Sequence, residues 1–125
     1  MSLKFLVVDD SITMRRIVVN SLKGLGYSEF LEAGDGKEAM DVLNSDSSIN
    51  FVITDWNMPN VSGLELVKNI RAHETYSNVP ILMVTTRGVK EDIMEALAAK
   101  VNNYVIKPFT PPILKEKIDQ ILASV

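Results

Sequence analysis

The chain has 125 residues, a formal net charge of −3, no cysteine, and 46% hydrophobic and 23% charged residues. This length suits one domain, and the balanced composition argues against intrinsic disorder. The absence of cysteine excludes disulfides, thiolate metal sites and cysteine nucleophiles, and the lack of a concentrated basic cluster argues against nucleic-acid binding.

The first predicted element is a strand over residues 4–8, in which 5-FLVV-8 is apolar. This run is too short for a signal peptide or a membrane span, so we expect a cytoplasmic protein without membrane insertion. A helix is predicted over residues 12–25, because apolar residues recur there at intervals of three and four, and Gly26 supplies its stop.

Strands and helices continue to alternate along the rest of the chain. Apolar runs predict strands over 29–33, 51–54, 80–84 and 103–106. Helical spacing predicts helices over 36–44, 62–73 and 89–99, and a last helix with Thr110 as its N-cap and Pro111 and Pro112 in its first turn. The predicted fold is α/β: a single domain over 1–125 with a doubly wound, five-stranded parallel sheet, (βα)5, and the flavodoxin-like strand order 2-1-3-4-5.

Polar side chains stand at the carboxyl ends of four predicted strands. They are Asp9-Asp10, Asp55, Thr85-Thr86 and Lys107. Each alone has an ordinary structural explanation, such as a helix cap for Asp10 or Ser11, a turn residue for Asp55, or a solvated stem for Lys107. A parallel sheet, however, brings all four strand ends to the same edge, where ligands of such folds bind.

Three carboxylates that lie close together repel one another unless a cation lies between them. Asp9, Asp10 and Asp55, with a backbone carbonyl near Asn57, offer the oxygen ligands that Mg²⁺ prefers. Lys107 adds a positive charge and Thr85 a hydroxyl donor, which suit a phosphoryl group. Aspartate is a known nucleophile for phosphoryl transfer, and no Gly-rich nucleotide-binding loop is present.

The chain resembles the receiver domains of two-component response regulators, in particular those of the chemotaxis CheY type. The resemblance runs from Lys4 to about Ala123. Four motifs carry it: 5-FLVVDDSITMRRIV-18, 52-VITDWNMPNVSGLEL-66, 81-ILMVTT-86 and 104-YVIKPF-109.

This resemblance implies a role for each matching residue. Asp55 would accept a phosphoryl group from a histidine kinase, and Asp9, Asp10 and the Asn57 carbonyl would bind Mg²⁺ beside it. Lys107 and Thr85 would contact the phosphoryl group, and Tyr104 would rotate inward as Thr85 moves, as a switch. The Lys107–Pro108 peptide would be cis. Such a protein is not an enzyme in the ordinary sense, since it catalyses only its own phosphorylation and dephosphorylation.

The chemotaxis type further implies a monomer without an output domain that signals by binding. The expected partners are the kinase CheA, the flagellar motor switch protein FliM and a phosphatase. Two other functions fit part of the pattern. A receiver in a non-motor phosphorelay, or one acting as a phosphate sink, would use identical chemistry. A haloacid-dehalogenase-type phosphatase would share the strand-end groups, but its first motif needs a second aspartate where this chain has Ser11.

Two residues depart from the pattern of chemotaxis receivers. Arg87 follows Thr85 by two positions, where an acidic residue is common. Lys100 stands where a glycine usually ends the fourth helix. The lysine implies a different cap, a modest conformational cost, or a longer helix in which Asn102 or Asn103 takes the left-handed position.

Overall fold

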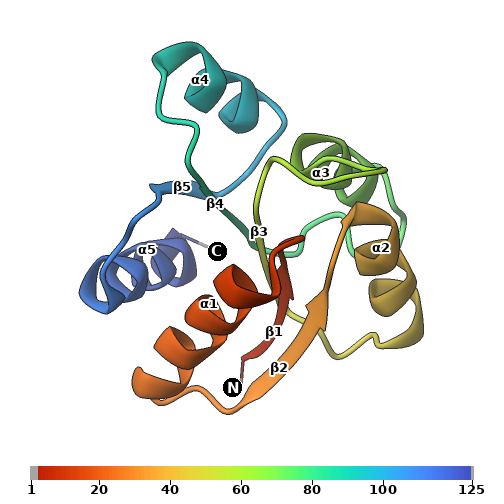
Figure 1. Ribbon diagram of the computed structural model, residues 1–125. Coiled ribbons are helices and arrows are strands. Elements are labelled where there is room, and N and C mark those ends of the chain that lie inside the picture. Colours follow the sequence, from red (N-terminus) through yellow and green to blue (C-terminus); the bar gives the residue numbers. More distant parts are fainter. Residues whose placement is uncertain (1–2, 125) are drawn as a thin grey trace.

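The computed structural model describes residues 3–124, in which five strands alternate with five helices (Figure 1). The strands are β1 (Lys4–Val8), β2 (Glu29–Ala33), β3 (Phe51–Thr54), β4 (Ile81–Thr85) and β5 (Asn103–Ile106). The helices are α1 (Ile12–Gly24), α2 (Gly36–Ser45), α3 (Gly63–Arg71), α4 (Lys90–Ala98) and α5 (Pro111–Ser124). Every predicted element is present within two residues of its predicted bounds. The ends of the predicted domain, residues 1–2 and 125, lie outside the described residues.

The sheet has the strand order β2-β1-β3-β4-β5, and every neighbouring pair is parallel, which confirms the predicted topology. Its register aligns the strand ends. Val8 lies opposite both Ala33 and Thr54, and Thr85 lies opposite Ile106. The residues that follow these strands therefore start from one common edge.

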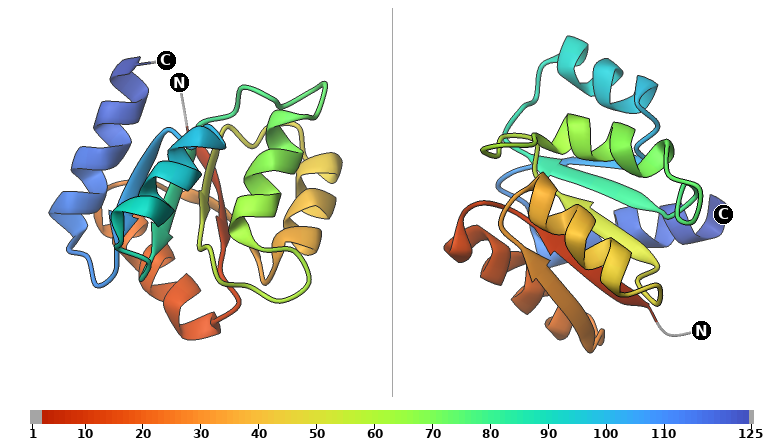
Figure 2. Two further views of the ribbon diagram at one scale, coloured as in Figure 1. Left: turned by 90° about the horizontal axis from the view of Figure 1, so that it is seen from above. Right: turned by 90° about the vertical axis from the view of Figure 1, so that its right-hand side faces the viewer.

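Helices cover both faces of the sheet. The views in Figures 1 and 2 show α1 and α5 on one face and α2, α3 and α4 on the other. Because side chains alternate along a strand, Phe5 and Val7 pack with α1 and α5, whereas Leu6 and Val8 pack with the other three helices. Along residues 3–124 no helix is both long and apolar enough to cross a membrane.

Side-chain caps fix where α1, α2 and α3 begin at the common edge. The Ser11 hydroxyl accepts from the Met14 N–H at 3.2 Å, so Ser11 rather than Asp10 caps α1. Asp35 caps α2, and Ser62 caps α3. Helix α5 starts directly after Thr110, whose carbonyl accepts from the Leu114 N–H at 3.1 Å. The cap on α1 leaves the Asp10 carboxylate unused by the helix.

Helix α4 ends in a Schellman motif built on a lysine. Lys100 itself takes the left-handed conformation, with φ of 76°, so the alternative in which Asn102 or Asn103 takes it is wrong. The Val101 N–H donates to the Ala96 carbonyl at 3.3 Å, and the Lys100 N–H donates to the Leu97 carbonyl at 2.9 Å. Asn102 has another role, because its side-chain oxygen accepts from the Ile81 N–H at 2.8 Å at the start of β4.

Candidate functional site

The chain segments just beyond the strands remain hydrogen-bonded to the neighbouring strands. The Asp9 N–H donates to the Ala33 carbonyl at 3.1 Å, and the Asp55 N–H donates to the Val8 carbonyl at 2.9 Å. The Lys107 N–H donates to the Thr85 carbonyl at 2.9 Å. These bonds extend the sheet by one residue at each end, so the three side chains project from rigid backbone.

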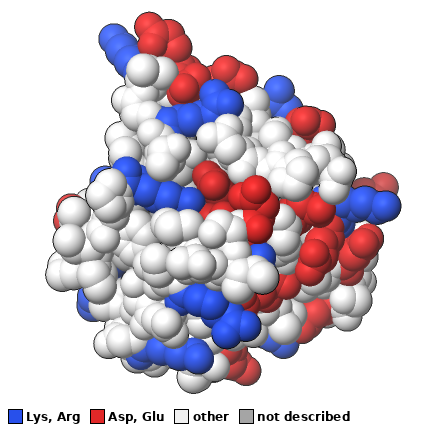
Figure 3. All heavy atoms as spheres, in the orientation of Figure 1, with Lys and Arg blue, Asp and Glu red and all other residues white. Residues whose placement is uncertain are grey.

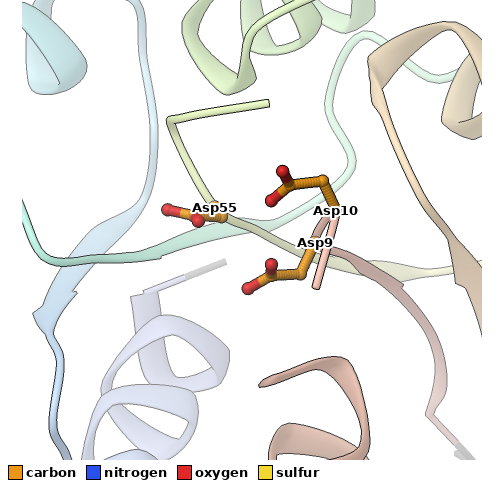
Figure 4. A group of neighbouring side chains, drawn as sticks. All are labelled: Asp9, Asp10 and Asp55. Carbon is orange, nitrogen blue, oxygen red and sulfur yellow. The ribbon is translucent and has the colours of Figure 1, made fainter. Parts of the chain in front are cut away.

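Three carboxylates meet at this edge. Asp9, Asp10 and Asp55 each offer an oxygen, and these oxygens lie within 4.8 Å of one another (Figure 4). Asp9 is 3% exposed, Asp55 is partly buried and Asp10 is exposed. In Figure 3, acidic side chains gather near the middle of the face that is drawn, with basic side chains beside them. The structure thus brings together the three predicted carboxylates, Asp9, Asp10 and Asp55, in an arrangement open to solvent on one side, and we call them the acidic triad.

Lys107 neutralises part of this charge. Its Nζ lies 2.8 Å from Asp9 Oδ2 and 3.3 Å from Asp55 Oδ2, and its side chain is only 8% exposed. A buried ammonium group of this kind requires partners, and the two carboxylates supply them. The Lys107–Pro108 peptide is cis, as the resemblance implied.

The loop between β3 and α3 passes very close to the Asp55 backbone. The Trp56 N–H donates to Asp55 Oδ1 at 2.6 Å, and the Gly63 N–H donates to the Trp56 carbonyl at 2.8 Å. A Cβ on Gly63 would stand 1.8 Å from the Asp55 carbonyl oxygen, so only glycine permits this approach. Asn60, with φ of 64°, donates from its side chain to Asp35 Oδ2 at 3.0 Å and fastens the loop to α2.

Arg87 connects this loop with the segment that follows β4. Its Nε and Nη2 donate to Asn57 Oδ1 at 3.0 and 2.9 Å, and its guanidinium lies 4.5 Å from the centre of the Trp56 ring. It also pairs with Asp92 on α4 at 3.7 Å. Arg87 and Asn57 line a shallow hollow together with Asp10. The departure from an acidic residue therefore places a cation beside the acidic triad, bound to neutral and acidic partners.

The predicted switch residues meet at the backbone of Arg87. Thr85 is fully buried, and its hydroxyl oxygen accepts from the Arg87 N–H at 3.4 Å. Tyr104 is 8% exposed, and its hydroxyl donates to the Arg87 carbonyl at 2.5 Å. Burial, with the nearby charges of Asp92 and Asp55, raises the pKa of Tyr104 to about 12, although Arg87 acts in the opposite direction. In this structure the Tyr104 ring is already inside the protein.

One contact to the acidic triad had no assigned role in the sequence. Arg15 on α1 donates from Nη1 to the Asp9 carbonyl at 2.7 Å and from Nε to Glu32 Oε1 at 3.0 Å. The helical pattern around Arg15 marks the core face of α1, but it does not indicate where a long side chain at the edge of that face ends. The position of Arg15, six residues after Asp9, is the signal that was available.

The donor set suits a hard divalent cation. The acidic triad offers oxygen atoms only, and part of it faces solvent, which fits an ion such as Mg²⁺ that keeps several of its waters. Among residues 3–124, every buried side-chain nitrogen or oxygen has a hydrogen-bond partner. The exposed Asp10 carboxylate is the member of the triad that is most accessible from solvent.

Comparison with known proteins assigns the family. The family model of the response regulator receiver domain matches residues 5–119. A chemotaxis protein CheY homolog of Campylobacter jejuni is 53% identical over 98% of this chain and 94% of its own length. Chemotaxis protein CheY1 of Helicobacter pylori is 51% identical over 98% of both chains.

Solved structures agree with this assignment. Chemotaxis protein CheY4 of Vibrio cholerae superposes with a TM-score of 0.88 at 36% identity, over 97% of this chain and 99% of that one. A putative response regulator from Chloroflexus aurantiacus superposes with a TM-score of 0.90 at 32% identity, over 98% of this chain and 99% of that one. With its fold, its edge of strand-end side chains and these relatives, the chain belongs to the response regulator receiver domains and, within them, to the CheY type of chemotaxis.

Proposed function

We propose that this protein is a receiver that accepts a phosphoryl group on Asp55 from the histidine kinase CheA and then binds the flagellar motor switch protein FliM. The observation that carries the proposal is the convergence of Asp9, Asp10 and Asp55 within 4.8 Å, with Lys107 in contact with two of them. Its place is in signalling rather than in metabolic catalysis. On this proposal residues 1–125 form one receiver domain that acts as a cytoplasmic monomer.

The proposed transfer moves one phosphoryl group between two side chains. A carboxylate oxygen of Asp55 attacks the phosphorus of a phosphohistidine, a P–O bond forms, and the P–N bond breaks. The histidine nitrogen leaves with the electron pair of that bond and is neutralised by a proton. Because such a transition state is loose, the protein contributes mainly by positioning groups and neutralising charge.

Asp9, Asp10, Asp55 and the backbone carbonyl of Asn57 are the proposed ligands of Mg²⁺. When bound, this ion neutralises charge on the phosphoryl oxygens and on the carboxylates. The rigid backbone of Asp9 and Asp55 supports this role, because both residues remain hydrogen-bonded to neighbouring strands. That receiver domains in general bind Mg²⁺ at an acidic pocket supports the same assignment.

Lys107, Thr85 and Tyr104 are proposed to read the arrival of the phosphoryl group. Lys107 would exchange its present bonds to Asp9 and Asp55 for an ion pair with a phosphoryl oxygen. Thr85 would donate its hydroxyl to another oxygen. Both Thr85 and Tyr104 are hydrogen-bonded to the backbone of Arg87, so a movement of Thr85 is transmitted to the bond that holds Tyr104.

An exposed apolar surface supports a binding output. It lies on and around α4, β5 and α5, next to Tyr104. Five of the seven large apolar side chains that are exposed among residues 3–124 lie there, namely Val89, Met94, Leu97, Ile106 and Ile113, and the other two, Ile12 and Ile17, lie on α1. A concentration of exposed apolar groups indicates a protein-binding site. This favours the motor-binding function over a phosphate sink, which needs no target surface.

Trp56 provides the first test. It is 6% exposed and lies beside both Asp55 and Arg87, so its fluorescence should respond to Mg²⁺ and then to acetyl phosphate or a beryllofluoride mimic. The Asp55→Asn variant should lose the second response. An absence of both responses in the parent protein would refute the proposal, and turnover of a phosphate ester would instead favour a phosphatase.

A binding assay tests the output. A peptide from the N-terminus of FliM should bind the beryllofluoride form more tightly than the untreated form, measured by fluorescence anisotropy. A matched Leu97→Asp variant should keep the Trp56 response and lose the peptide. Equal binding by both forms of the parent would favour a phosphorelay or sink.

A further inference from the structure

We infer that Arg15 is a positioning residue of the cation site, which holds the Asp9–Asp10 peptide in the orientation that Mg²⁺ requires. This inference rests on the proposed function, because it concerns the same cation. Arg15 lies on α1, one turn past the acidic pair, and its side chain is 15% exposed.

The main chain of Asp9 is held on both sides. Its N–H donates to the Ala33 carbonyl of β2 at 3.1 Å, and its carbonyl accepts from Arg15 Nη1 at 2.7 Å. The carbonyl belongs to the peptide unit that joins Asp9 to Asp10. Because a peptide unit is planar, a fixed carbonyl also fixes the nitrogen and Cα of Asp10.

Asp10 depends on this backbone more than its neighbours do. Asp9 is held at its carboxylate by the Ser11 N–H and Lys107, and Asp55 is held by the Trp56 N–H and Lys107. The Asp10 carboxylate is exposed and has no hydrogen bond or ion pair with any of residues 3–124. The position of the Asp10 carboxylate therefore follows from the orientation of the Asp10 backbone, which Arg15 helps to set.

Arg15 is itself held in place. Its Nε donates to Glu32 Oε1 at 3.0 Å, so the planar guanidinium spans Glu32 on β2 and the Asp9 carbonyl at once. A lysine has one point charge and cannot span two acceptors in this fixed geometry.

Positioning and charge predict opposite effects of removing Arg15. The positive charge of Arg15 repels an entering cation, so its loss would tighten Mg²⁺ binding if charge alone mattered. Loss of positioning would weaken binding, since removal of an outer partner of a metal ligand typically costs about 10–100-fold in affinity. Mg²⁺ demands near-ideal octahedral geometry, whereas Ca²⁺ tolerates flexible sites. A positioning residue should therefore affect Mg²⁺ more than Ca²⁺.

The test measures Mg²⁺ and Ca²⁺ dissociation constants of the full chain by Trp56 fluorescence or calorimetry at constant ionic strength. We expect Arg15→Met to weaken Mg²⁺ binding about tenfold and to lower the preference for Mg²⁺ over Ca²⁺. Arg15→Lys, which keeps the charge and the fold, should also weaken Mg²⁺ binding, by a smaller factor. Arg16→Met is the matched control, because Arg16 is 64% exposed and contacts Glu32 at 3.3 Å. It should bind Mg²⁺ within twofold of the parent.

The outcomes separate this inference from the proposed function. If the parent shows no saturable response to Mg²⁺, both are overturned. If the parent binds Mg²⁺ and the two Arg15 variants bind it as tightly or more tightly, only the role of Arg15 is overturned. Should Arg15→Met fail to fold by circular dichroism, Arg15→Lys decides the question, and an unchanged ion preference in that variant overturns the inference.

Discussion

Arg87 shows how one side chain can serve several elements at this site. Its guanidinium contacts Asn57, Trp56 and Asp92, and its backbone bonds both Thr85 and Tyr104. An acidic side chain at this position could accept from the Asn57 amide, but it could not lie over the Trp56 ring favourably or pair with Asp92. An arginine at this position therefore changes how the loops around the site are held, while the backbone bonds to the predicted switch residues do not depend on its side chain.

Titration of the Tyr104 hydroxyl makes the stability of the protein fall as the pH rises in the alkaline range. Burial foremost raises the pKa of Tyr104 to about 12, whereas a tyrosine in an unfolded chain titrates near 10. Between these values the unfolded state has lost the proton that the folded state keeps. The stabilising contribution is therefore complete below pH of about 10 and is lost as the pH rises toward about 12.

Urea midpoints at pH 9 and pH 11 test this expectation. The parent should lose more stability between the two values than Tyr104→Phe, because the variant has no phenol to titrate. Comparison of the two losses cancels the lysines, which titrate in both proteins. At pH 9 the variant should be the less stable protein, since it lacks the bond to the Arg87 carbonyl. Equal losses would show that Tyr104 has an ordinary pKa.

Element ends explain a second departure from the family pattern. Helix α4 closes with both Schellman hydrogen bonds, although its C′ residue is Lys100 with φ of 76°. Glycine adopts this conformation at little steric cost, whereas a residue with a Cβ is strained there. Arg71 supports the turn, because its Nε donates to the Lys100 carbonyl at 3.0 Å. The motif is therefore maintained by bonds from outside the helix as well as within it.

We predict that Lys100→Gly unfolds at higher urea than Lys100→Ala, with a difference of about 1 kcal/mol in the free energy of unfolding. Both variants remove the lysine charge near the helix C-terminus, so their comparison isolates the backbone conformation. Arg71 donates to the backbone carbonyl of residue 100, so this hydrogen bond is retained in both variants. If the alanine variant is as stable as the glycine variant, the left-handed strain at position 100 is absent.

The strand-end site and the end of helix α4 differ in how far they could be predicted from the sequence. Asp9, Asp10, Asp55 and Lys107 were predictable as neighbours, because apolar runs identify parallel strands and the strands align their carboxyl ends. The left-handed conformation at Lys100 was not, since a lysine has no preference for it and Asn102 offers a better candidate by chemistry. The contact between Arg15 and the Asp9 carbonyl depends on a side-chain rotamer and on Glu32 from another strand. Neither that rotamer nor the position of Glu32 can be predicted from the spacing of residues along one helix.

At the scale of the whole molecule, the acidic triad opposes folding unless a cation lies between its carboxylates. Oxygens of the three carboxylates lie within 4.8 Å of one another, and among the described residues the Lys107 ammonium forms ion pairs with Asp9 and Asp55 but not with Asp10. The Asp10 charge is left without a direct partner in the described part of the chain and is repelled by its neighbours. Sites of this kind lower stability in exchange for function.

Because of this repulsion, we predict that Asp10→Asn is more stable than the parent without Mg²⁺ and less stable than the parent with Mg²⁺. In EDTA the variant should be the more stable protein, on the order of 1 kcal/mol, because one repelling charge is gone while its exposure limits the gain. A ligand at 100 times its dissociation constant stabilises the folded state by about 2.7 kcal/mol, so excess Mg²⁺ should raise the parent above a variant that has lost a ligand. Urea unfolding followed by circular dichroism measures both differences.

Asp41→Asn, which removes an exposed charge on α2 away from the triad, is the control and should leave the Mg²⁺ effect unchanged. If Asp10→Asn gains as much stability from Mg²⁺ as the parent, Asp10 is not a ligand, and if it gains none in EDTA, the triad does not strain the fold.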